Sequence, residues 1–361
     1  MKQRYYLAIG LMTFSLTLNS KDMNTETIKL PQEEITITQE WDKVFPKSDK
    51  VEHKKVTFPN RFGFTLVADV YIPKDTKVPL PAIAVCGPFG AVKEQSSGLY
   101  AQEMAERGFY TLAFDPSFTG ESSGQPRYMT SPDINTEDFS AAIDYLVTNP
   151  MVNPEEVGII GICGWGGIAI NAAASDPRIK ATVASTMYDM SRVDANGYFD
   201  SADSPEARNE LRDMLSAQRT EDFKNGTPKL AGGVPDVVPE DAPQFLKDYH
   251  AYYKTERGYH PRSLNSNGGR NVTAVIPWIN APLMSRAGEI ENAVMVVHGE
   301  KAHSFYFGSD TYKKLKVTPG KDNNKLFMVI PGASHTDLYD QKDKIPFDAI
   351  ESFFTEYLRK K

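Results

Sequence analysis

The sequence predicts an α/β fold, in which a mostly parallel sheet is flanked by helices and carries a helical cap insertion. Three observations support this class. From about residue 51, short apolar runs alternate with segments of helical periodicity, and such alternation is typical of parallel sheets with right-handed crossovers. The alternation stops over residues 187–291 and then resumes. The 361-residue chain is also long enough to bury a large core without disulfides or metals.

The elements of the first half follow from two apolar patterns. Residues 55–58 and 64–72 alternate apolar and polar side chains across a short turn, which indicates two strands. Continuous apolar runs such as 81–86 indicate strands that are buried on both faces. The helix expected at 97–107 ends at Gly108. By the same criteria, further strands are expected at 110–114, 157–162 and 179–186, and further helices at 135–148 and 166–174.

The second half begins with an interruption of the strand–helix pattern. Helices are expected at 211–220 and 245–254 within it, but no strand. A break of roughly 100 residues between two sheet strands predicts a cap at the carboxyl edge of the sheet, where open α/β folds bind ligands. The pattern then returns with strands at 293–297 and 325–330 and helices at 309–315 and 347–358.

The N-terminus has the pattern of a secretory signal. Lys2 and Arg4 precede a mostly apolar stretch that ends at Leu18. We therefore expect export, to the periplasm or out of the cell, with a cytoplasmic location as the alternative. The expected segments are a signal peptide (1–20), a polar leader (21–50), the first part of the core (51–186), the cap insertion (187–291) and the second part of the core (292–361).

Composition excludes several classes of protein. A net charge of −7 argues against nucleic-acid binding, which usually needs a basic face. The two cysteines exclude a disulfide-rich fold and a cysteine-based zinc module. After the N-terminal stretch no apolar run is long enough to span a bilayer, so stable membrane insertion is not expected once the signal is removed.

The segment VGIIGICGWGG carries the chemistry that the sequence predicts. A buried strand ends at Ile162, Cys163 follows, and a glycine-rich turn opens a helix. A nucleophile on such a sharp turn needs small neighbours, and the N–H groups of the helix lower the pKa of its thiol. Two other interpretations remain open: Cys163 is a buried core cysteine, or it pairs with Cys86 at the end of the neighbouring strand.

On these residues the chain resembles the α/β-hydrolase superfamily, and within it the dienelactone hydrolase-like group, over about residues 53–361. That group has a Gly-x-Cys-x-Gly turn and a Cys–His–Asp triad. Trp165 departs from the pattern, and we expect it to form a pocket wall. The loop after Cys86 is similar to the oxyanion loop of the group, which implies Phe89 N–H and Gly164 N–H as the oxyanion donors.

The resemblance also implies a general base and an acid. His335, in a loop after the last expected strand, stands where the group has its histidine. Ala302 stands where the group usually has its aspartate. Glu300 is the nearest carboxylate, Asp189 is an alternative acid, and a Cys–His pair without any acid is the third possibility.

Two other groups of residues suggest a binding function, but we interpret both as structural. His298 and His303 have the spacing of metal ligands, but no third ligand lies near them in the sequence, so satisfied loop histidines are favoured. The tyrosine-rich stretch 249–259 is interpreted as packing within the cap rather than as a carbohydrate-stacking face. No phosphate loop or dinucleotide motif is present, and neither a cofactor nor a metal is expected.

The sequence therefore predicts a hydrolase that cleaves a small ester, lactone or thioester through an acyl-enzyme on Cys163. Its expected partner is a small-molecule substrate. The alternatives are a non-catalytic binding protein with the same fold, or an acyltransferase or peptidase that uses the same site. Oligomeric state is not encoded in any pattern that we can interpret.

Overall fold

The computed structural model describes residues 33–359, apart from residues 78, 318 and 320–322. The predicted signal peptide (1–20) and the first part of the predicted leader lie outside these residues. Among the described helices, none combines the length and the apolar character that a membrane crossing requires.

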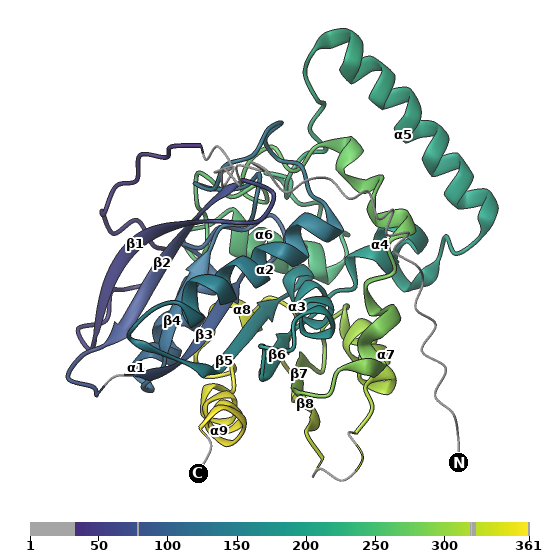
Figure 1. Cartoon of the computed structure of the whole chain (residues 1–361). Helices are drawn as coiled ribbons and strands as arrows, with labels where there is room; N and C mark the ends of the chain where they lie inside the picture. Colours follow the sequence, from purple (N-terminus) through teal and green to yellow (C-terminus); the bar gives the residue numbers. More distant parts are fainter. Residues whose placement is uncertain (1–32, 78, 318, 320–322, 360–361) are drawn as a thin grey trace, which may run out of the picture. The chain divides into compact units, whose positions relative to one another are not determined.

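One sheet forms the centre of the described chain. Its strands are β1 (Val51–Pro59), β2 (Thr65–Pro73), β3 (Leu80–Cys86), β4 (Tyr110–Phe114), β5 (Val152–Ile162), β6 (Ala181–Ser185), β7 (Ala293–Gly299) and β8 (Lys325–Ile330). In the described residues the order across the sheet is β1-β2-β4-β3-β5-β6-β7-β8 (Figure 1). β1, β2 and β4 pair antiparallel, and all other neighbours pair parallel. The predicted fold class is therefore confirmed.

The strand order reverses beside β3. The chain first adds β4 on one side of β3 and then returns to add β5 on the other side. Such a reversal opens a crevice at the carboxyl ends of the strands involved. Cys86 ends β3 and is paired with Gly161 of β5, so the loop after Cys86 and the turn at Cys163 lie at the same edge.

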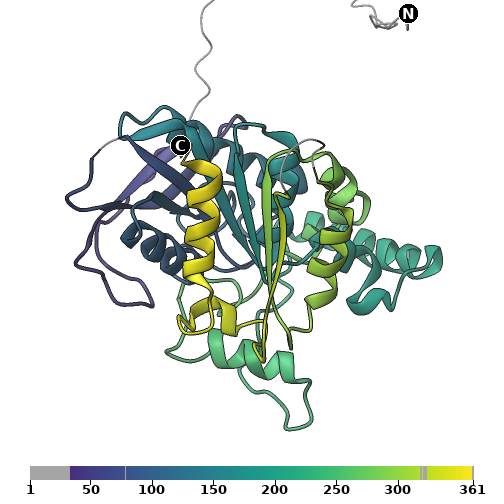
Figure 2. The same ribbon diagram turned by 90° about the horizontal axis from the view of Figure 1, so that it is seen from below.

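Helices cover both faces of the sheet. The connection through α1 (Ser96–Glu106) runs along the strand order toward β1, whereas the connections through α2 (Pro132–Val147), α3 (Gly164–Ser175) and α7 (Phe305–Lys314) run toward β8. Because parallel crossovers are right-handed, α1 lies on the opposite face of the sheet from these three helices. α1 packs with α9 (Phe347–Leu358), and α2 packs with α3 (Figures 1 and 2). The strands between these layers are apolar on both sides, and β3 and β4 are buried along their whole length.

The segment between β6 and β7 has no strand of the sheet in its described residues. It contains α4 (Met190–Asn196), η1 (Tyr198–Asp200), α5 (Pro205–Asn225), α6 (Gln244–Tyr253), η2 (Val272–Val275), η3 (Trp278–Asn280) and η4 (Leu283–Glu289). α5 extends away from the sheet (Figure 1), and of its residues only Leu215 is buried.

Several predicted elements coincide with the structure, whereas α5 is longer than predicted. β4, β8 and α9 span the predicted ranges. α5 begins earlier than the predicted 211–220 because the Ser204 side chain accepts a hydrogen bond from Ala207 N–H at 3.0 Å, directly before a proline. It continues to Gly226, whose left-handed φ of 67° ends the helix. Apolar periodicity alone did not reveal these signals.

Candidate active site

Cys163 stands at a strained turn between β5 and α3. Its φ of 57° and ψ of −125° lie outside the regions that ordinary residues prefer. The N–H groups of Gly166 and Tyr188 both donate to the Cys163 carbonyl, at 2.9 and 2.8 Å. A Cβ at Gly161 would lie only 2.1 Å from the Trp165 carbonyl oxygen, so the turn needs glycine there. The turn therefore presents the Cys163 side chain at the first residues of α3.

Two backbone donors converge on the sulfur of Cys163. Burial raises the pKa of this thiol, and hydrogen bonds from the N–H groups of Gly164 and Phe89 offset part of that rise. The loop that carries Phe89 is held by Asn265, whose side-chain amide donates to the Phe89 carbonyl at 2.8 Å and whose N–H donates to the Gly90 carbonyl at 3.2 Å. Two fixed donors beside a nucleophile form the arrangement that stabilises an oxyanion.

His335 reaches Cys163 through a tyrosine. The Nε2 atom of His335 lies 2.9 Å from the hydroxyl of Tyr339, and this hydroxyl stands close enough to the Cys163 sulfur to lower the pKa of the thiol as a hydrogen-bond donor. On the other side of the ring, Nδ1 lies 2.6 Å from the Ser304 hydroxyl and 2.9 Å from the Thr186 hydroxyl. The predicted nucleophile and base therefore lie in one hydrogen-bonded chain, with Tyr339 between them.

Three histidines gather behind this chain. Burial, together with nearby His303 and His298, lowers the pKa of His335 well below its usual range. The His303 and His335 ring centroids are 5.1 Å apart, and Nε2 of His303 hydrogen-bonds the Tyr188 hydroxyl. His298 is buried with Nε2 3.2 Å from the Met187 carbonyl oxygen. The Nε2 atoms of His298 and His303 thus have protein partners, but His298 lies in strand β7 rather than in a loop, and its Nδ1 atom is buried without a hydrogen-bond partner among the described residues.

Neither predicted acid lies at His335. The Glu300 side chain is on the exposed side of its turn and accepts a hydrogen bond from Gly332 N–H at 2.8 Å. Asp189 caps α4 and accepts from Arg192 N–H at 3.1 Å. In the described residues no carboxylate hydrogen-bonds either ring nitrogen of His335. The assignment of Glu300, and of Asp189 as its alternative, is therefore wrong in this structure.

Hydroxyl groups take the place of the acid. Ala302, at the expected aspartate position, is buried and has no polar side chain, and Ser304 two residues later contacts His335 instead. Sequence reasoning missed Ser304, Thr186 and Tyr339. Only Tyr339 had a local signal, because it follows His335 by four residues and lies in the short helix α8 (Asp337–Asp340).

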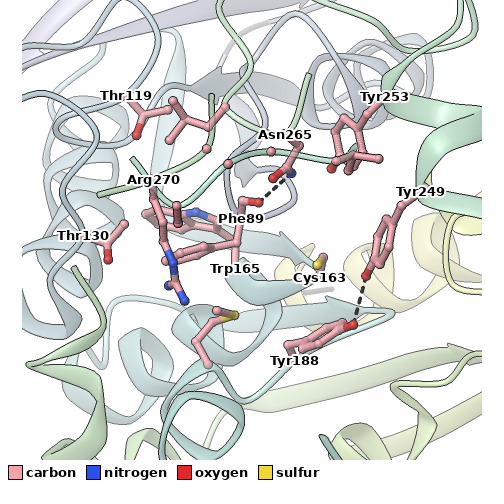
Figure 3. A pocket seen from close by; sticks show the side chains of 18 of the residues that line it. Phe89, Thr119, Thr130, Cys163, Trp165, Tyr188, Tyr249, Tyr253, Asn265 and Arg270 are labelled. Carbon is pink, nitrogen blue, oxygen red and sulfur yellow. Dashed lines mark hydrogen bonds between the residues drawn. The ribbon is translucent and has the colours of Figure 1, made fainter. Parts of the chain in front are cut away.

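A cavity of about 360 Å³ opens over Cys163 (Figure 3). One wall is apolar and includes Phe89, Trp165 and Met190, and segments of the insertion supply much of the rest. Trp165 also packs edge-on against Phe114 at 5.6 Å, so the residue that departs from the hydrolase pattern belongs to both cavity wall and core. Hydroxyl groups line the other side through Tyr188, Tyr198, Tyr249, Tyr253 and Tyr339.

Arg270 is the one charged side chain among the described residues that line this cavity. Its guanidinium pairs with both carboxylate oxygens of Asp194, at 2.7 and 3.2 Å, and lies 5.3 Å from the centre of the Phe89 ring. The cavity wall therefore offers a positive group and hydroxyl groups but no carboxylate.

The tyrosine-rich stretch 249–259 divides between two roles. Tyr249 and Tyr253 line the cavity, and the Tyr249 hydroxyl lies 3.0 Å from that of Tyr188. Tyr252 is buried against Tyr339, and Tyr259 is exposed. The predicted packing role thus fits Tyr252, whereas the two cavity tyrosines face the substrate space.

The two cysteines are free. The Cys86 thiol donates to the Phe114 carbonyl at 3.6 Å. Its strand lies beside that of Cys163, as expected, but the pairing that we considered is not formed.

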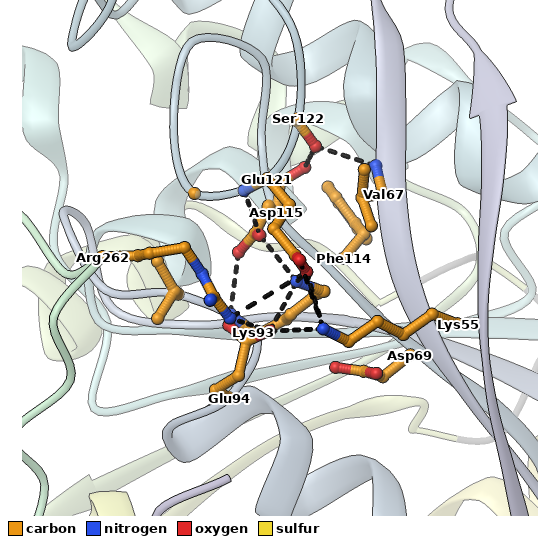
Figure 4. A network of polar contacts seen from close by, with 12 residues as sticks. Lys55, Val67, Asp69, Lys93, Glu94, Phe114, Asp115, Glu121, Ser122 and Arg262 are labelled. Carbon is orange, nitrogen blue, oxygen red and sulfur yellow. Dashed lines mark hydrogen bonds and ion pairs between the residues drawn. The ribbon is translucent and has the colours of Figure 1, made fainter. Parts of the chain in front are cut away.

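Three carboxylates near the oxyanion loop hold an ammonium group. Glu94, Asp115 and Glu121 lie close enough together to hold a metal ion. Lys93 Nζ fills the space between them, 2.6 Å from Glu94 and 2.9 Å from Asp115, and it also contacts Glu121 (Figure 4). Lys93, together with Lys55 at Glu121 and Arg262 at Glu94, thus already supplies three positive charges to this cluster.

Comparison with known proteins adds the family. The sequence model of the X-Pro dipeptidyl-peptidase (S15) family matches residues 63–328. The chain belongs to the S15 family. It is 54% identical to the uncharacterized protein PA2218 of Pseudomonas aeruginosa over 90% of this chain and 86% of that protein. It is 33% identical to the uncharacterized protein YcjY of Escherichia coli, over 85% of this chain and 99% of that protein.

Solved structures share the fold of this chain. The crystal structure of PA2218 superposes with a TM-score of 0.86, covering 91% of this chain and all (100%) of that chain. The α/β hydrolase GrgF from Penicillium superposes with a TM-score of 0.69 at 19% identity over 86% of this chain and 100% of its own, which shows the fold alone. A shorter match, 35% identical over 28% of this chain and 32% of the relative, is to the thiohydrolase aneE of Aspergillus aculeatus. The chain is thus an α/β hydrolase by fold, and the dienelactone hydrolase-like subgroup stays a prediction.

Proposed function

We propose that the protein hydrolyses a small ester, lactone or thioester through a covalent acyl-enzyme on Cys163. The observation that carries this proposal is the position of the Cys163 sulfur at a positive-φ turn, beside the N–H groups of Gly164 and Phe89 and at the wall of the cavity. A sulfur so placed attacks a carbonyl carbon, while each of the two donors stabilises the developing oxyanion by about 3 kcal/mol.

The reaction proceeds in two halves. The Cys163 thiol gives up its proton to His335, and its sulfur forms a bond to the carbonyl carbon. The protonated His335 then donates that proton to the departing oxygen or sulfur, and an acyl-enzyme thioester remains. Water next gives a proton to His335 and attacks the thioester, and the proton returns to the Cys163 sulfur as the acid is released.

The cavity favours acyl esters or thioesters over peptides with a free N-terminus. A peptidase that recognises the free N-terminus of its substrate has to neutralise the N-terminal ammonium in a site of low dielectric constant. Among the described residues that line the cavity, Arg270 is the charged one and is already paired with Asp194, so no lining carboxylate is present to neutralise an ammonium. The match to a relative named as a thiohydrolase supports thioesters as the first substrates to assay.

The test compares the two cysteines of the chain. We expect wild-type protein to hydrolyse p-nitrophenyl acetate and butyrate and an alkyl thiobutyrate, and Cys163→Ala to lose about 1000-fold in rate. Cys86→Ala, the matched control, removes a buried thiol outside the cavity and keeps turnover. Mass spectrometry of quenched wild-type reactions should find one acyl group on the peptide that contains Cys163.

Other results would select the alternatives. Equal rates in wild type and Cys163→Ala would exclude the nucleophile. Acyl-enzyme formation that proceeds to product only with an added alcohol or amine would indicate acyl transfer. Ligand binding in the cavity without turnover of any ester or thioester would indicate a binding protein.

A further inference from the structure

Tyr339 separates the sulfur of Cys163 from the imidazole of His335. Its hydroxyl lies 2.9 Å from Nε2 of His335 and hydrogen-bonds the thiol. Cys163 and Tyr339 both line the cavity, whereas His335 is 1% exposed and does not line it. The base is therefore shielded from the cavity, and the hydroxyl of Tyr339 links it to the nucleophile.

We propose that Tyr339 is a further catalytic residue, which carries the proton between Cys163 and His335. This inference rests on the proposed role of Cys163 as nucleophile. In one concerted step the S–H bond of Cys163 breaks and its proton forms a new O–H bond on Tyr339. The original phenolic proton of Tyr339 moves to Nε2 of His335. The products are a thiolate, an unchanged neutral tyrosine and an imidazolium, so charge and protons balance.

The partners of His335 select the tautomer that this relay requires. Nε2 accepts a proton only if Nδ1 already carries one. The hydroxyls of Ser304 and Thr186, at 2.6 and 2.9 Å, are acceptors for an Nδ1–H group. Ser304 and Thr186 are thus positioning residues that turn the basic nitrogen of His335 toward Tyr339.

Packing fixes the ring of Tyr339 in this place. Its neighbours are Tyr252, at a centroid distance of 5.1 Å, His335 at 5.3 Å and Tyr253 at 6.2 Å. Burial raises the pKa of Tyr339 well above its usual value, and the nearby Cys163 adds to that rise. The hydroxyl therefore keeps a proton in the resting state and passes one on only as it receives another.

The experiment follows alkylation of Cys163 by iodoacetamide at pH 7. We expect Tyr339→Phe and His335→Ala each to slow alkylation about 100-fold, the usual size of a general-base contribution. Because both act in one relay, the double variant should be no slower than either single variant. Tyr252→Phe, which removes a neighbouring buried hydroxyl that does not line the cavity, is the control and should react like wild type.

These outcomes decide between a relay and a structural role. Tyr339→Phe that alkylates as fast as wild type overturns the proposal. So do losses in the two single variants that multiply in the double variant. Alkylation needs no ester turnover, so it judges Tyr339 even if the wild type hydrolyses none of the esters and the proposed function fails.

A measurement on the wild type alone gives a second test that does not depend on the folding of any variant. The acylation rate with p-nitrophenyl acetate is measured in mixtures of H₂O and D₂O. Once the low fractionation factor of the thiol proton is divided out, two protons moving together give a curved dependence of rate on deuterium fraction, whereas a single direct transfer from Cys163 to His335 gives a straight line. A straight line would overturn the relay.

Discussion

At the scale of single residues, the charge of His335 depends on what its Nδ1 atom contacts. Hydroxyl groups of Ser304 and Thr186 stand where a triad would place a carboxylate. A carboxylate favours the imidazolium, whereas neutral hydroxyls do not, and burial lowers the pKa of His335 well below its usual range. Because the base stays neutral at mildly acidic pH, activity should persist below pH 6.5, where an ordinary histidine would already be protonated.

The variant Ser304→Asp tests this dependence. A carboxylate beside Nδ1 favours the charged ring, so the pKa of His335 should rise. The acidic limb of the kcat/KM profile should therefore move to higher pH, by one unit or more for a close carboxylate. Ser304→Asn, which is similar in size but uncharged, should leave the limb in place. If the acidic limb lies at the same pH in both variants, the charge of the side chain beside Nδ1 does not set the pKa of His335.

At the scale of elements, the turn from β5 to α3 depends on close backbone contacts. Four glycines flank Cys163, and each is packed too closely for a side chain. A Cβ at Gly166 would lie 2.5 Å from Met187 Cβ, and one at Gly167 would lie 2.2 Å from the Tyr188 carbonyl oxygen. Met187 and Tyr188, which follow β6, thus pack directly on the first turn of α3 and fix the direction of the Cys163 side chain.

Gly167→Ala should destabilise the protein by about 2–3 kcal/mol, because the added methyl group clashes with a backbone oxygen that cannot move freely. Gly226→Ala is the comparison, since nothing lies within 4 Å of its Cβ position. It should cost only the strain of a left-handed alanine, about 1 kcal/mol. Urea unfolding of the two variants measures both changes. Equal losses would mean that the contact at Gly167 relaxes.

The sequence predicted the elements of the site better than their contacts. The local pattern of a buried strand, a turn and a helix was sufficient to place Cys163, whereas Phe89 and His335 came from the resemblance to the hydrolase group. The partners of His335 were not predictable in this way, because Ser304 and Thr186 are 31 and 149 residues distant in the chain. Glu300 was chosen by proximity in sequence, but its side chain points to the exposed side of the turn.

At the scale of the whole described unit, a buried ion network joins the cap insertion to the oxyanion loop (Figure 4). Arg262, from the insertion, lies 2.8 Å from Glu94 and 2.6 Å from Asp42. Lys93 joins Glu94 to Asp115 at the end of β4. Since Lys93 and Glu94 follow Phe89 in the same loop, the network couples the position of the oxyanion donor to the seating of the cap.

Lys93→Met should remove the centre of this network. Although burial alone would lower the pKa of Lys93, Asp115 and Glu94 raise it well above its usual value. Its loss leaves the buried Asp115 without its cationic partner, while Glu94 and Glu121 keep Arg262 and Lys55, and we expect a loss of about 3–5 kcal/mol in the free energy of unfolding.

Lys50→Met is the control for this prediction. Lys50 forms an exposed pair with Glu106 at 3.0 Å, and its removal should change stability by less than about 1 kcal/mol. Urea unfolding at pH 7 compares the two variants. A Lys93→Met protein as stable as wild type would show that the carboxylates take up protons without cost.

The raised pKa of Cys163 has a consequence for the durability of the protein. Peroxide attacks thiolates far faster than thiols, and each step of that damage beyond the sulfenic acid is hard to reverse. A nucleophile that is protonated at rest, and ionised only while a substrate is being attacked, gives oxidants little to react with. If Cys163 is the nucleophile, we therefore expect the protein to lose activity to peroxide more slowly than an enzyme whose cysteine rests as a thiolate.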